Sequence, residues 1–326
     1  MTCRILVTGG CGFIGSNFIN YILRSDPTIH VVNIDCLNYC ADTANVKEPE
    51  EPGSRYKFIQ GNICSKDLIL HILREYEICT IVHFAAQSHV DNSFDNSLQY
   101  TTDNVVGTHT LLQAAKEYGK LTKFLHFSTD EVYGEVDRDH PGCCEKSLLN
   151  PTNPYAATKA AAEFIVRSYY HSFGLPVVIV RCNNVYGPNQ YPEKLIPKFI
   201  KLLREGKSLT IHGKGETRRN FIWAEDVARA TQLIMTAGAI NEIYNIGTSC
   251  EKTVMDVAAL LVKHMTKEND NDITNHITYV PDRPFNDFRY AIDSSRLREL
   301  GWSEKHTDFE ANVLSLIQTA VAKQDN

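Results

Sequence analysis

The chain has 326 residues, a length that predicts two lobes or one large α/β domain and excludes a small scaffold held by disulfides. Hydrophobic residues make up 43% of the chain and charged residues 22%, so neither a disordered chain nor a fibre is expected. The net charge is −6 without a basic stripe in the sequence, which argues against nucleic acid as a partner.

Short apolar runs rich in β-branched residues alternate with helical patterns through the first half of the chain. The expected strands are Arg4–Thr8, His30–Asp35, Tyr56–Gln60, Thr80–Phe84, Lys123–Ser128 and Val177–Arg181. The helices expected between them are Phe13–Arg24, Lys66–Glu75, Leu98–Tyr118 and Tyr155–Phe173. Strand and helix in repetition predict an α/β fold with a doubly wound parallel sheet.

After about Asn183 the pattern changes to loops rich in Pro, Gly, Asn and Arg. The helices expected among these loops are Leu195–Arg204, Ala224–Thr236, Val254–Met265 and Phe309–Ala322. This change predicts a second, smaller α+β lobe over residues 183–326, beside a first domain of residues 1–182. We expect some later segments to return to the first sheet.

A glycine-rich turn lies between the first expected strand and the first expected helix, with glycines at Gly9, Gly12 and Gly15. Such a turn lets a pyrophosphate approach the N-terminus of the helix. Asp35 ends the second expected strand, where a carboxylate can accept hydrogen bonds from an adenosine ribose and repel a 2′-phosphate. The alternative is a turn that only packs a helix on a sheet, but the strand context and Asp35 favour a Rossmann site for NAD.

The segment Ser128–Gly134 begins where an expected strand ends, at the sheet edge where open α/β folds bind ligands. It contains Thr129 and the adjacent carboxylates of Asp130 and Glu131. A shared site can separate the pKa values of two carboxylates, so that one acts as an acid and the other as a base. An isolated Asp-Glu pair is usually a solvated turn, but the position of this pair favours catalysis.

Tyr155 and Lys159 are one helical turn apart, so their side chains lie on one helix face. A nearby ammonium lowers the pKa of a phenol and lets the tyrosinate act as a base. In a chain with 15 tyrosines such a pair can arise by chance, and it is informative because it follows the dinucleotide motif.

We expect a cytoplasmic protein without a membrane partner or a metal site. The N-terminal apolar run is too short for a signal peptide, and no later run approaches about 18 apolar residues. The 10 cysteines form no CxxC pair and have no histidine at ligand spacing, so they are expected to be reduced thiols.

Together these motifs make the chain similar to the extended short-chain dehydrogenase/reductases and, within them, to the nucleoside-diphosphate-glucose 4,6-dehydratases. The resemblance extends almost from end to end and rests on TGGCGFIGSNF, HFAAQSHVDNS, NVVGTHTLL, STDEVYGE, NPYAATKAAAE, NNVYGPNQYPEKLIPKFI, FIWAEDVA, YNIGT and DRPFNDFRYAID. The Thr-Asp-Glu triplet is its specific part, because the related sugar epimerases have small uncharged residues there. The resemblance implies an NAD-binding domain over residues 1–182 and a mainly nucleotide-sugar domain over residues 183–326.

The resemblance also implies a reaction with internal NAD redox cycling, toward rhamnose or another deoxysugar. Tyr155 would take the proton of the sugar 4-OH, while Thr129 holds O4 and Lys159 tunes the phenol. Glu131 would then remove the C5 proton, and Asp130 would protonate the departing 6-OH. The implied cofactor contacts are Gly9, Gly12, Phe13, Ile14, Gly15, Asp35, Leu37, Asn38, Asn62, Ile63, Ala85, Ala86, Ser88, Tyr155, Lys159 and Asn184. The implied substrate contacts are Ser88, Thr129, Asn183, Lys194, Leu195, Arg219, Arg283 and Asn286.

Three positions depart from the bacterial dTDP-glucose enzymes or from the wider family. Gln87 and Asn286 resemble the eukaryotic forms, including the dehydratase half of plant rhamnose synthase, and favour UDP-glucose over dTDP-glucose. Asn62 replaces an Asp that is common near the adenine, and it keeps an oxygen acceptor.

The sequence leaves two other functions open. A nucleotide-sugar 4-epimerase or decarboxylase could use the same scaffold, since a fold does not determine a function, but a simple epimerase has no use for Asp130 and Glu131. A non-catalytic NAD-binding protein would have no need of Thr129, Tyr155 and Lys159.

The resemblance further implies a homodimer, formed by the two long helical segments Leu98–Tyr118 and Tyr155–Phe173.

Overall fold

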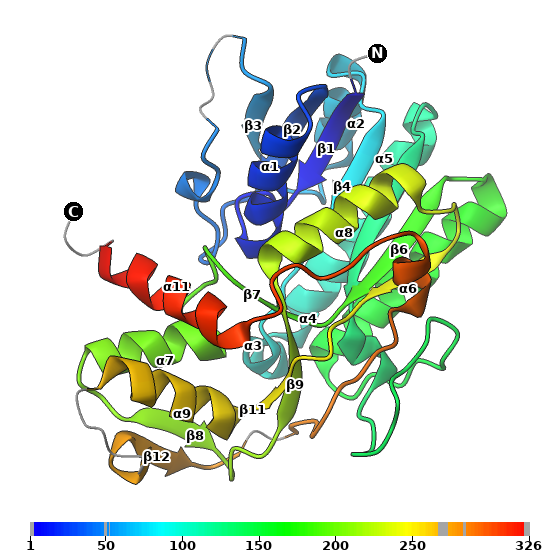
Figure 1. The fold of residues 1–326 in the computed structure, drawn as a ribbon. Coiled ribbons are helices and arrows are strands. Elements are labelled where there is room, and N and C mark those ends of the chain that lie inside the picture. Colours follow the sequence, from blue (N-terminus) through cyan, green and yellow to red (C-terminus); the bar gives the residue numbers. More distant parts are fainter. Residues whose placement is uncertain (1–2, 49–50, 52, 267–272, 283–284, 323–326) are drawn as a thin grey trace.

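Seven parallel strands form the central sheet, in the order β10-β6-β5-β4-β1-β2-β3 (Figure 1). The strands are β1 (Cys3–Thr8), β2 (Ile29–Asp35), β3 (Tyr56–Gln60), β4 (Thr80–His83), β5 (Lys123–Thr129), β6 (Val177–Cys182) and β10 (Ile243–Ile246). The structure is a computed structural model that describes residues 3–48, 51, 53–266, 273–282 and 285–322. The expected doubly wound parallel sheet is confirmed.

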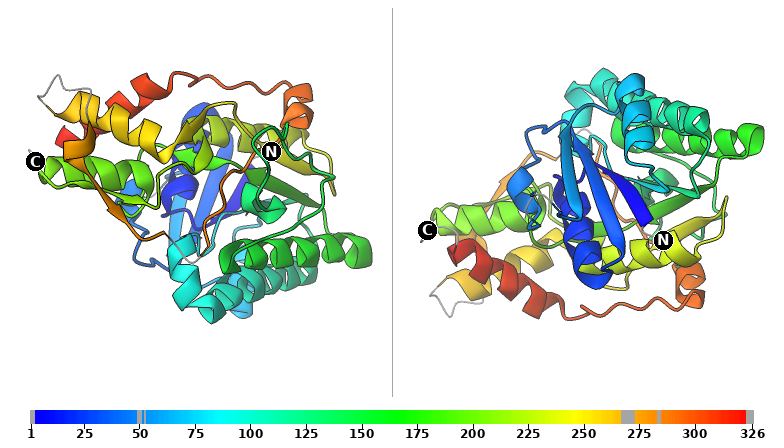
Figure 2. Two further views of the ribbon diagram at one scale, coloured as in Figure 1. Left: turned by 90° about the horizontal axis from the view of Figure 1, so that it is seen from below. Right: turned by 90° about the horizontal axis from the view of Figure 1, so that it is seen from above.

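Helices cover both faces of this sheet, so its strands are buried on both sides. Successive residues of β1 alternate between the faces, as the pleat of a strand requires: Ile5 and Val7 belong to one core and Leu6 to the other. Figure 2 shows the two helical layers on opposite sides. They are α1 (Phe13–Ser25) and α8 (Ala224–Ala237) on one face, and α2 (Lys66–Glu75), α5 (Gly107–Tyr118) and α6 (Pro154–Phe173) on the other.

The helix expected over Leu98–Tyr118 is interrupted in the structure. It consists of α4 (Ser97–Tyr100), a π-helical segment η2 (Thr101–Val106) and α5. The hydroxyls of Thr101 and Thr102 donate to the carbonyl oxygens four residues earlier, which competes with regular helical bonding. Single π turns inside helices are frequent at functional sites, and this one places Asn104 against the loop after β4.

The second lobe contains two small sheets and its own core. Its strands are β7 (Asn184–Tyr186), β9 (Arg218–Trp223) and β11 (Glu251–Thr253) in one sheet, and β8 (Leu209–His212) with β12 (Ile277–Val280) in the other. Its main helices are α7 (Leu195–Arg204), α9 (Val254–Met265) and α11 (Phe309–Ala322). Tyr186, Phe221 and Phe309 meet at the centre of the core, with ring centroids 5.0 to 6.0 Å apart.

Two elements that follow residue 182 pack with the first domain, one in its sheet and one in its helical layer. β10 pairs with β6 as an edge strand, and α8 packs beside α1. The division into domains at residue 182 stays a prediction, since the chain crosses between the lobes more than once. Among the described helices, none has the length and apolar character needed to cross a membrane.

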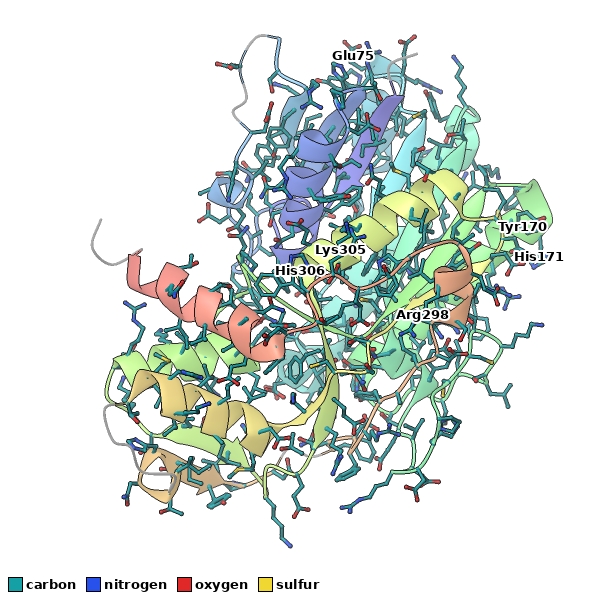
Figure 3. The ribbon with its side chains drawn as sticks, in the orientation of Figure 1. Glu75, Tyr170, His171, Arg298, Lys305 and His306 are labelled. Atoms are coloured by element: carbon teal, nitrogen blue, oxygen red, sulfur yellow. The ribbon has the colours of Figure 1, made fainter. Side chains whose placement is uncertain are left out.

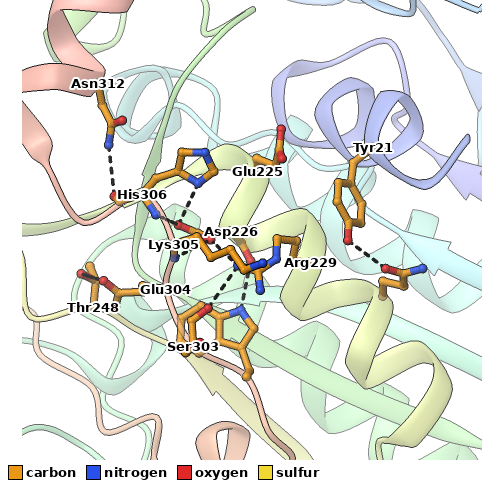
Figure 4. A network of polar contacts seen from close by, with 12 residues as sticks. Tyr21, Glu225, Asp226, Arg229, Thr248, Ser303, Glu304, Lys305, His306 and Asn312 are labelled. Carbon is orange, nitrogen blue, oxygen red and sulfur yellow. Dashed lines mark hydrogen bonds and ion pairs between the residues drawn. The ribbon is translucent and has the colours of Figure 1, made fainter. Parts of the chain in front are cut away.

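A buried carboxylate, that of Asp226 on α8, fastens the segment before α11 to the central sheet (Figure 4). Asp226 accepts hydrogen bonds from the backbone N–H groups of Lys305 at 3.0 Å and His306 at 2.8 Å. Arg229 Nη1 donates a third, at 2.8 Å. Lys305 and His306 lie beside α8 in Figure 3, so this carboxylate ties the C-terminal part of the second lobe to the sheet.

Candidate active site

A cleft of about 520 Å³ opens at the carboxyl ends of the central strands. It lies where the chain passes from one side of β1 to the other, between β1 and β4, which is the usual ligand position in doubly wound sheets. The expected site residues that line it are Gly9, Gly12, Phe13, Ile14, Gly15, Asp35, Asn38, Asn62, Ile63, Ala85, Ala86, Ser88, Thr129, Glu131, Tyr155, Lys159, Asn183, Asn184 and Lys194. The structure therefore brings most of the expected residues into one place.

The glycine turn at the floor of the cleft requires glycine. Gly9 has φ +71°, and a Cβ atom there would lie 2.7 Å from the backbone of Ala85. A Cβ atom at Gly15 would lie 2.3 Å from the carbonyl oxygen of Gly9. These contacts bring the turn, the loop after β4 and the first turn of α1 closer together than any side chain would allow.

Gly12 leaves open space in front of α1. It is the N-cap residue of that helix, and a Cβ atom there would meet only the Gly9 carbonyl oxygen, at 3.3 Å. The first backbone N–H groups of a helix have no partner within the helix and carry a partial positive charge. The opening thus fits a pyrophosphate at the N-terminus of α1, as a bound dinucleotide requires.

Asp35, at the end of β2, is buried and faces both the glycine turn and the cleft. Its carboxylate accepts hydrogen bonds from the backbone N–H of Cys11 at 3.0 Å and of Leu37 at 2.9 Å. Burial raises the pKa of Asp35, and these N–H donors oppose that shift. A carboxylate has about four acceptor positions, so Asp35 can hold the turn and still accept from a ribose.

Tyr155 and Thr129 meet at the inner end of the cleft. The Thr129 hydroxyl, at the end of β5, is hydrogen-bonded to the Tyr155 phenol at the start of α6. Both residues are almost fully buried. Burial and the charge of Glu131 raise the pKa of Tyr155, whereas the bond to Thr129 lowers it.

Lys159, one helical turn after Tyr155 on α6, is held by the main chain of β5. Its Nζ donates to the carbonyl oxygen of Phe127 at 2.6 Å. Burial lowers the pKa of Lys159 to about 8, while Glu163 on the same helix opposes this shift. That Lys159 tunes the phenol of Tyr155 stays a prediction.

Asp130 and Glu131 occupy different environments in the short helical turn η3 (Asp130–Tyr133) that follows β5. Asp130 is buried behind Thr129 and accepts from Asn183 Nδ2 at 2.7 Å, and it does not line the cleft. Burial, with the charge of Glu131, raises the pKa of Asp130 to about 7. Glu131 is half-buried, lines the cleft and has a pKa raised by burial. One carboxylate thus holds a proton near neutral pH, as an acid and base pair requires.

Asn153 connects Glu131 to the helix that carries Tyr155. Its Oδ1 accepts from the Ala156 N–H at 2.8 Å and caps α6, and its Nδ2 donates to Glu131 Oε2 at 3.0 Å. Asn153 lies in the segment NPYAATKAAAE, but no role was expected for it. Asn followed by Pro at the first helical position is a strong helix-start signal, which could have drawn attention to Asn153.

The expected substrate residues do not all reach the cleft. Asn183 lines it, but its Nδ2 binds Asp130 and its Oδ1 accepts from the Thr248 N–H at 3.1 Å. Lys194 Nζ donates to the carbonyl oxygen of Ser88 at 3.0 Å across the cleft mouth. Leu195 packs against the core of the second lobe instead.

Three further expected residues, all among those that the structure describes, also lie outside the lining of the cleft. Leu37, with φ +56°, supports Asp35 from behind. Arg219 lies over the ring of Tyr290, with its Cζ 4.6 Å from the ring centroid. Asn286 donates to Asp282 at 3.0 Å, and Arg283 lies outside the described residues.

Several cleft residues had no role in the sequence analysis. Asp103, on η2, accepts from Gln87 Nε2 at 2.8 Å and from Gln99 Nε2 at 2.9 Å. Tyr39 donates to Glu193 at 2.9 Å across the cleft. These residues belong to loops and to the π-helical segment, where apolar periodicity carries no signal.

Among the described residues, no group of three or more His, Cys, Asp or Glu could hold a metal ion.

The parallel sheet, the glycine turn and the adjacent Thr129, Tyr155 and Lys159 define an extended short-chain dehydrogenase/reductase. A family model described as GDP-mannose 4,6 dehydratase matches residues 6–314, and the chain belongs to this family.

Named relatives are similar over almost the whole chain. A trifunctional UDP-glucose 4,6-dehydratase/UDP-4-keto-6-deoxy-D-glucose 3,5-epimerase/UDP-4-keto-L-rhamnose-reductase of Arabidopsis thaliana is 50% identical over 95% of this chain. This chain spans only 46% of that plant protein. A dTDP-D-glucose 4,6-dehydratase of Mus musculus is 46% identical over 93% of this chain and 84% of its own length.

The fold is also similar to a solved structure with ligands. The crystal structure of a dTDP-glucose 4,6-dehydratase from Streptomyces venezuelae, with NAD and TYD bound, has a TM-score of 0.90 and 37% sequence identity. The match covers 97% of this chain and 96% of that one.

Proposed function

We propose that this protein is a nucleoside-diphosphate-glucose 4,6-dehydratase that retains NAD. It converts UDP-glucose, the favoured substrate, or dTDP-glucose to the 4-keto-6-deoxyglucose nucleotide. The observation that carries the proposal is the pair Asp130 and Glu131 beside Thr129 and Tyr155, with one carboxylate buried and the other facing the cleft. A simple 4-epimerase has no use for this pair. The names of the plant and mouse relatives support the same reaction.

Three residues of the chain act in the oxidation step. NAD, when bound, supplies the hydride acceptor for C4, the later hydride donor for C6 and a positive charge near the phenol. Tyr155 takes the proton of the 4-OH, and the Thr129 hydroxyl holds both O4 and the phenol oxygen. The ammonium group of Lys159, held by its hydrogen bond to the Phe127 carbonyl oxygen, supplies a positive charge at this end of the site.

The two carboxylates divide the elimination of water. The ketone at C4 acidifies the C5 proton, and Glu131, which lines the cleft, removes this proton in its ionised form. Asp130 keeps a proton near neutral pH and gives it to the departing 6-OH. Since Asp130 lies behind Thr129, its carboxyl must turn toward the cleft when the sugar is bound.

Two of the expected determinants of base preference have partners within the chain. Gln87 binds Asp103 and the Asn104 side chain, and Asn286 binds Asp282. Gln87 lines the cleft on the cofactor side, where it would not contact the nucleotide base of the substrate. The proposed preference for UDP therefore rests mainly on Asn286 and on the similarity to the plant relative. One extra methyl group on thymine changes binding by only about 1–3 kcal/mol, so both substrates remain usable.

The protein is also proposed to be a homodimer in the cytoplasm. Helix α6 lies beside α4, η2 and α5 on one outer face (Figure 2). Leu98 is 83% exposed and Phe164 is 60% exposed on this face, and Val106 is exposed as well. Grouped exposed apolar side chains favour an interaction surface, in agreement with the four-helix interface that the family resemblance implies.

The test of the proposed activity is to incubate the purified protein separately with UDP-glucose and dTDP-glucose and to analyse the products by mass spectrometry. We expect a product lighter by one water molecule from each, with higher kcat/KM for UDP-glucose. Equal or higher kcat/KM with dTDP-glucose would refute the base preference alone. Formation of only an isomer of the substrate would refute the dehydratase function.

A further inference from the structure

A buried polar cluster lies next to the carboxylate pair but outside the cleft lining. Its centre is Asp287, which is 2% exposed and follows Asn286 in the C-terminal segment. Asp287 Oδ2 accepts two hydrogen bonds, from the Tyr290 hydroxyl and from Thr152 Oγ1 at 2.7 Å. We call Asp287, Tyr290 and Thr152 the Asp287 cluster. Sequence motifs assigned no role to any of its members.

One arm of the cluster leads to Glu131. Thr152 directly precedes Asn153, whose side chain caps α6 and donates to Glu131 Oε2 at 3.0 Å. The bond from Thr152 to Asp287 therefore fixes the loop that places the Asn153 amide. Any displacement of this loop moves the donor that orients the proposed base.

The other arm leads to Arg219. The Arg219 Cζ lies 4.6 Å from the centroid of the Tyr290 ring, so the guanidinium stacks on a ring whose hydroxyl Asp287 holds. The remaining bonds of Arg219 are to main-chain oxygens of Arg218 and Phe288 and a long contact to Asn286. Its charge acts on both Asp130 and Glu131, because it lowers the pKa of each.

The cluster is more than a buried structural link, because one carboxylate oxygen of Asp287 has no hydrogen-bond partner among the described residues. No described residue gives Asp287 Oδ1 a hydrogen bond, although a buried carboxylate oxygen without a partner is costly. Asp287 is also one of the charges that raise the pKa of Glu131, which places it within electrostatic reach of the base. An amide oxygen could accept the same two hydrogen bonds without a buried charge.

We propose that Asp287 is a positioning residue that holds Glu131, through Thr152 and Asn153, and Arg219, through Tyr290, in one arrangement across the two lobes. This inference rests on the proposed dehydratase function and names further residues for it. The two arms predict different kinetic effects. Loss of the Thr152 arm impairs proton removal by Glu131, whereas loss of the Tyr290 arm impairs substrate binding at Arg219.

The experiment measures kcat and KM for UDP-glucose in the full-length Thr152→Val, Tyr290→Leu and Tyr290→Phe variants. Thr152→Val keeps the shape of the side chain and removes the donor, so kcat should fall by up to about 10²-fold, the usual cost of a misplaced catalytic group. Its KM should stay close to that of the parent. Tyr290→Leu should raise KM by about tenfold, the loss expected for a partly desolvated cation–π contact. Tyr290→Phe keeps the ring under Arg219 but removes the hydroxyl that Asp287 holds, so its KM should lie between those of the parent and Tyr290→Leu.

A second measurement separates positioning from damage to the fold. Substrate should still reduce the bound nicotinamide of Thr152→Val, seen in its near-ultraviolet absorbance, because Tyr155 is intact. Tyr21→Phe is the matched control, since it removes a hydroxyl bonded to Gln232 at 3.0 Å between α1 and α8, away from the cleft. Thermal unfolding of all variants shows which of them fold as the parent does.

Two results would overturn the proposal. The first is that the Asp287-cluster variants behave like Tyr21→Phe in both kcat and KM. The second is that all of them lower kcat, raise KM and lose thermal stability in proportion, which is the pattern of a structural link. If the parent protein dehydrates neither sugar, the proposed function fails, and the Arg219 arm is then judged by UDP binding to Tyr290→Leu and Tyr290→Phe in calorimetry.

Discussion

Asn153 Nδ2 donates a hydrogen bond of 3.0 Å to Glu131 Oε2, while the Oδ1 of the same side chain caps α6. Because α6 carries Tyr155, one amide fixes the proposed base for elimination relative to the proposed base for oxidation. The same side chain therefore positions both Glu131 and Tyr155, and neither the Thr-Asp-Glu triplet nor the Tyr155–Lys159 pair indicates this.

Separating the two bonds of Asn153 tests this relationship. Asn153→Ala removes both, so the helix cap loses about 1 kcal/mol of stability and dehydration slows. Asn153→Asp keeps a good cap but replaces the donor with a negative charge beside Glu131, so stability should stay near that of the parent while dehydration is lost. Thermal unfolding and product formation measure the two effects. If Asn153→Asp dehydrates at the parent rate, the bond to Glu131 has no catalytic role.

The pKa of Asp130 predicts the pH dependence of the elimination. Burial and Glu131 raise it to about 7, and an acid must be protonated to act, so kcat should fall as the pH rises through about 7. Asn183 donates to Asp130 and lowers this pKa. Asn183→Ala should therefore move the alkaline fall of kcat to higher pH, measured at saturating substrate. A fall at the same pH in parent and variant would assign it to another group.

The open space at Gly12 predicts how the cofactor is held. A Cβ atom at Gly12 would meet only the Gly9 carbonyl oxygen, at 3.3 Å, and the φ of −77° is ordinary, so Gly12→Ala should fold normally. The added methyl group would stand where the pyrophosphate approaches α1. We expect the parent to release NAD on denaturation and the variant to release much less, measured by chromatography of the released nucleotide. Equal release from both would contradict the assignment.

The exposed apolar face of α4, η2 and α6 predicts the oligomeric state. Light scattering at micromolar concentration should give twice the chain mass of 36.8 kDa. Leu98→Asp combined with Phe164→Asp should halve this mass, because charges would be buried at the interface. Leu148→Asp is the matched control, since Leu148 is 91% exposed and belongs to the loop before α6 instead of these helices. A parent protein of 36.8 kDa would refute the dimer.

The parts that could be predicted from the sequence are those with a local signal. β1, α1 and α2 show their periodicity in short windows, and the glycine turn requires particular residues at fixed spacing. The cleft then follows, because the carboxyl ends of parallel strands meet at one edge.

The parts that could not be predicted depend on contacts between distant segments. β10 joins the first sheet by pairing with β6, which no local pattern indicates. The π-helical segment η2 depends on what Asn104 binds outside its own helix. Burial and the charge of Glu131 raise the pKa of Tyr155, and the spacing of Tyr155 and Lys159 carries no information on either cause.

The central claim is that the Asp130 and Glu131 pair performs the elimination while Tyr155 performs the oxidation. The most direct measurement follows bound-nicotinamide absorbance and water loss together, for the parent and for Glu131→Gln, after UDP-glucose is added. We predict that Glu131→Gln reduces its bound nicotinamide but forms the dehydrated sugar about 10²–10⁴-fold more slowly, the usual contribution of a positioned base. Dehydration by Glu131→Gln at the parent rate would contradict the account.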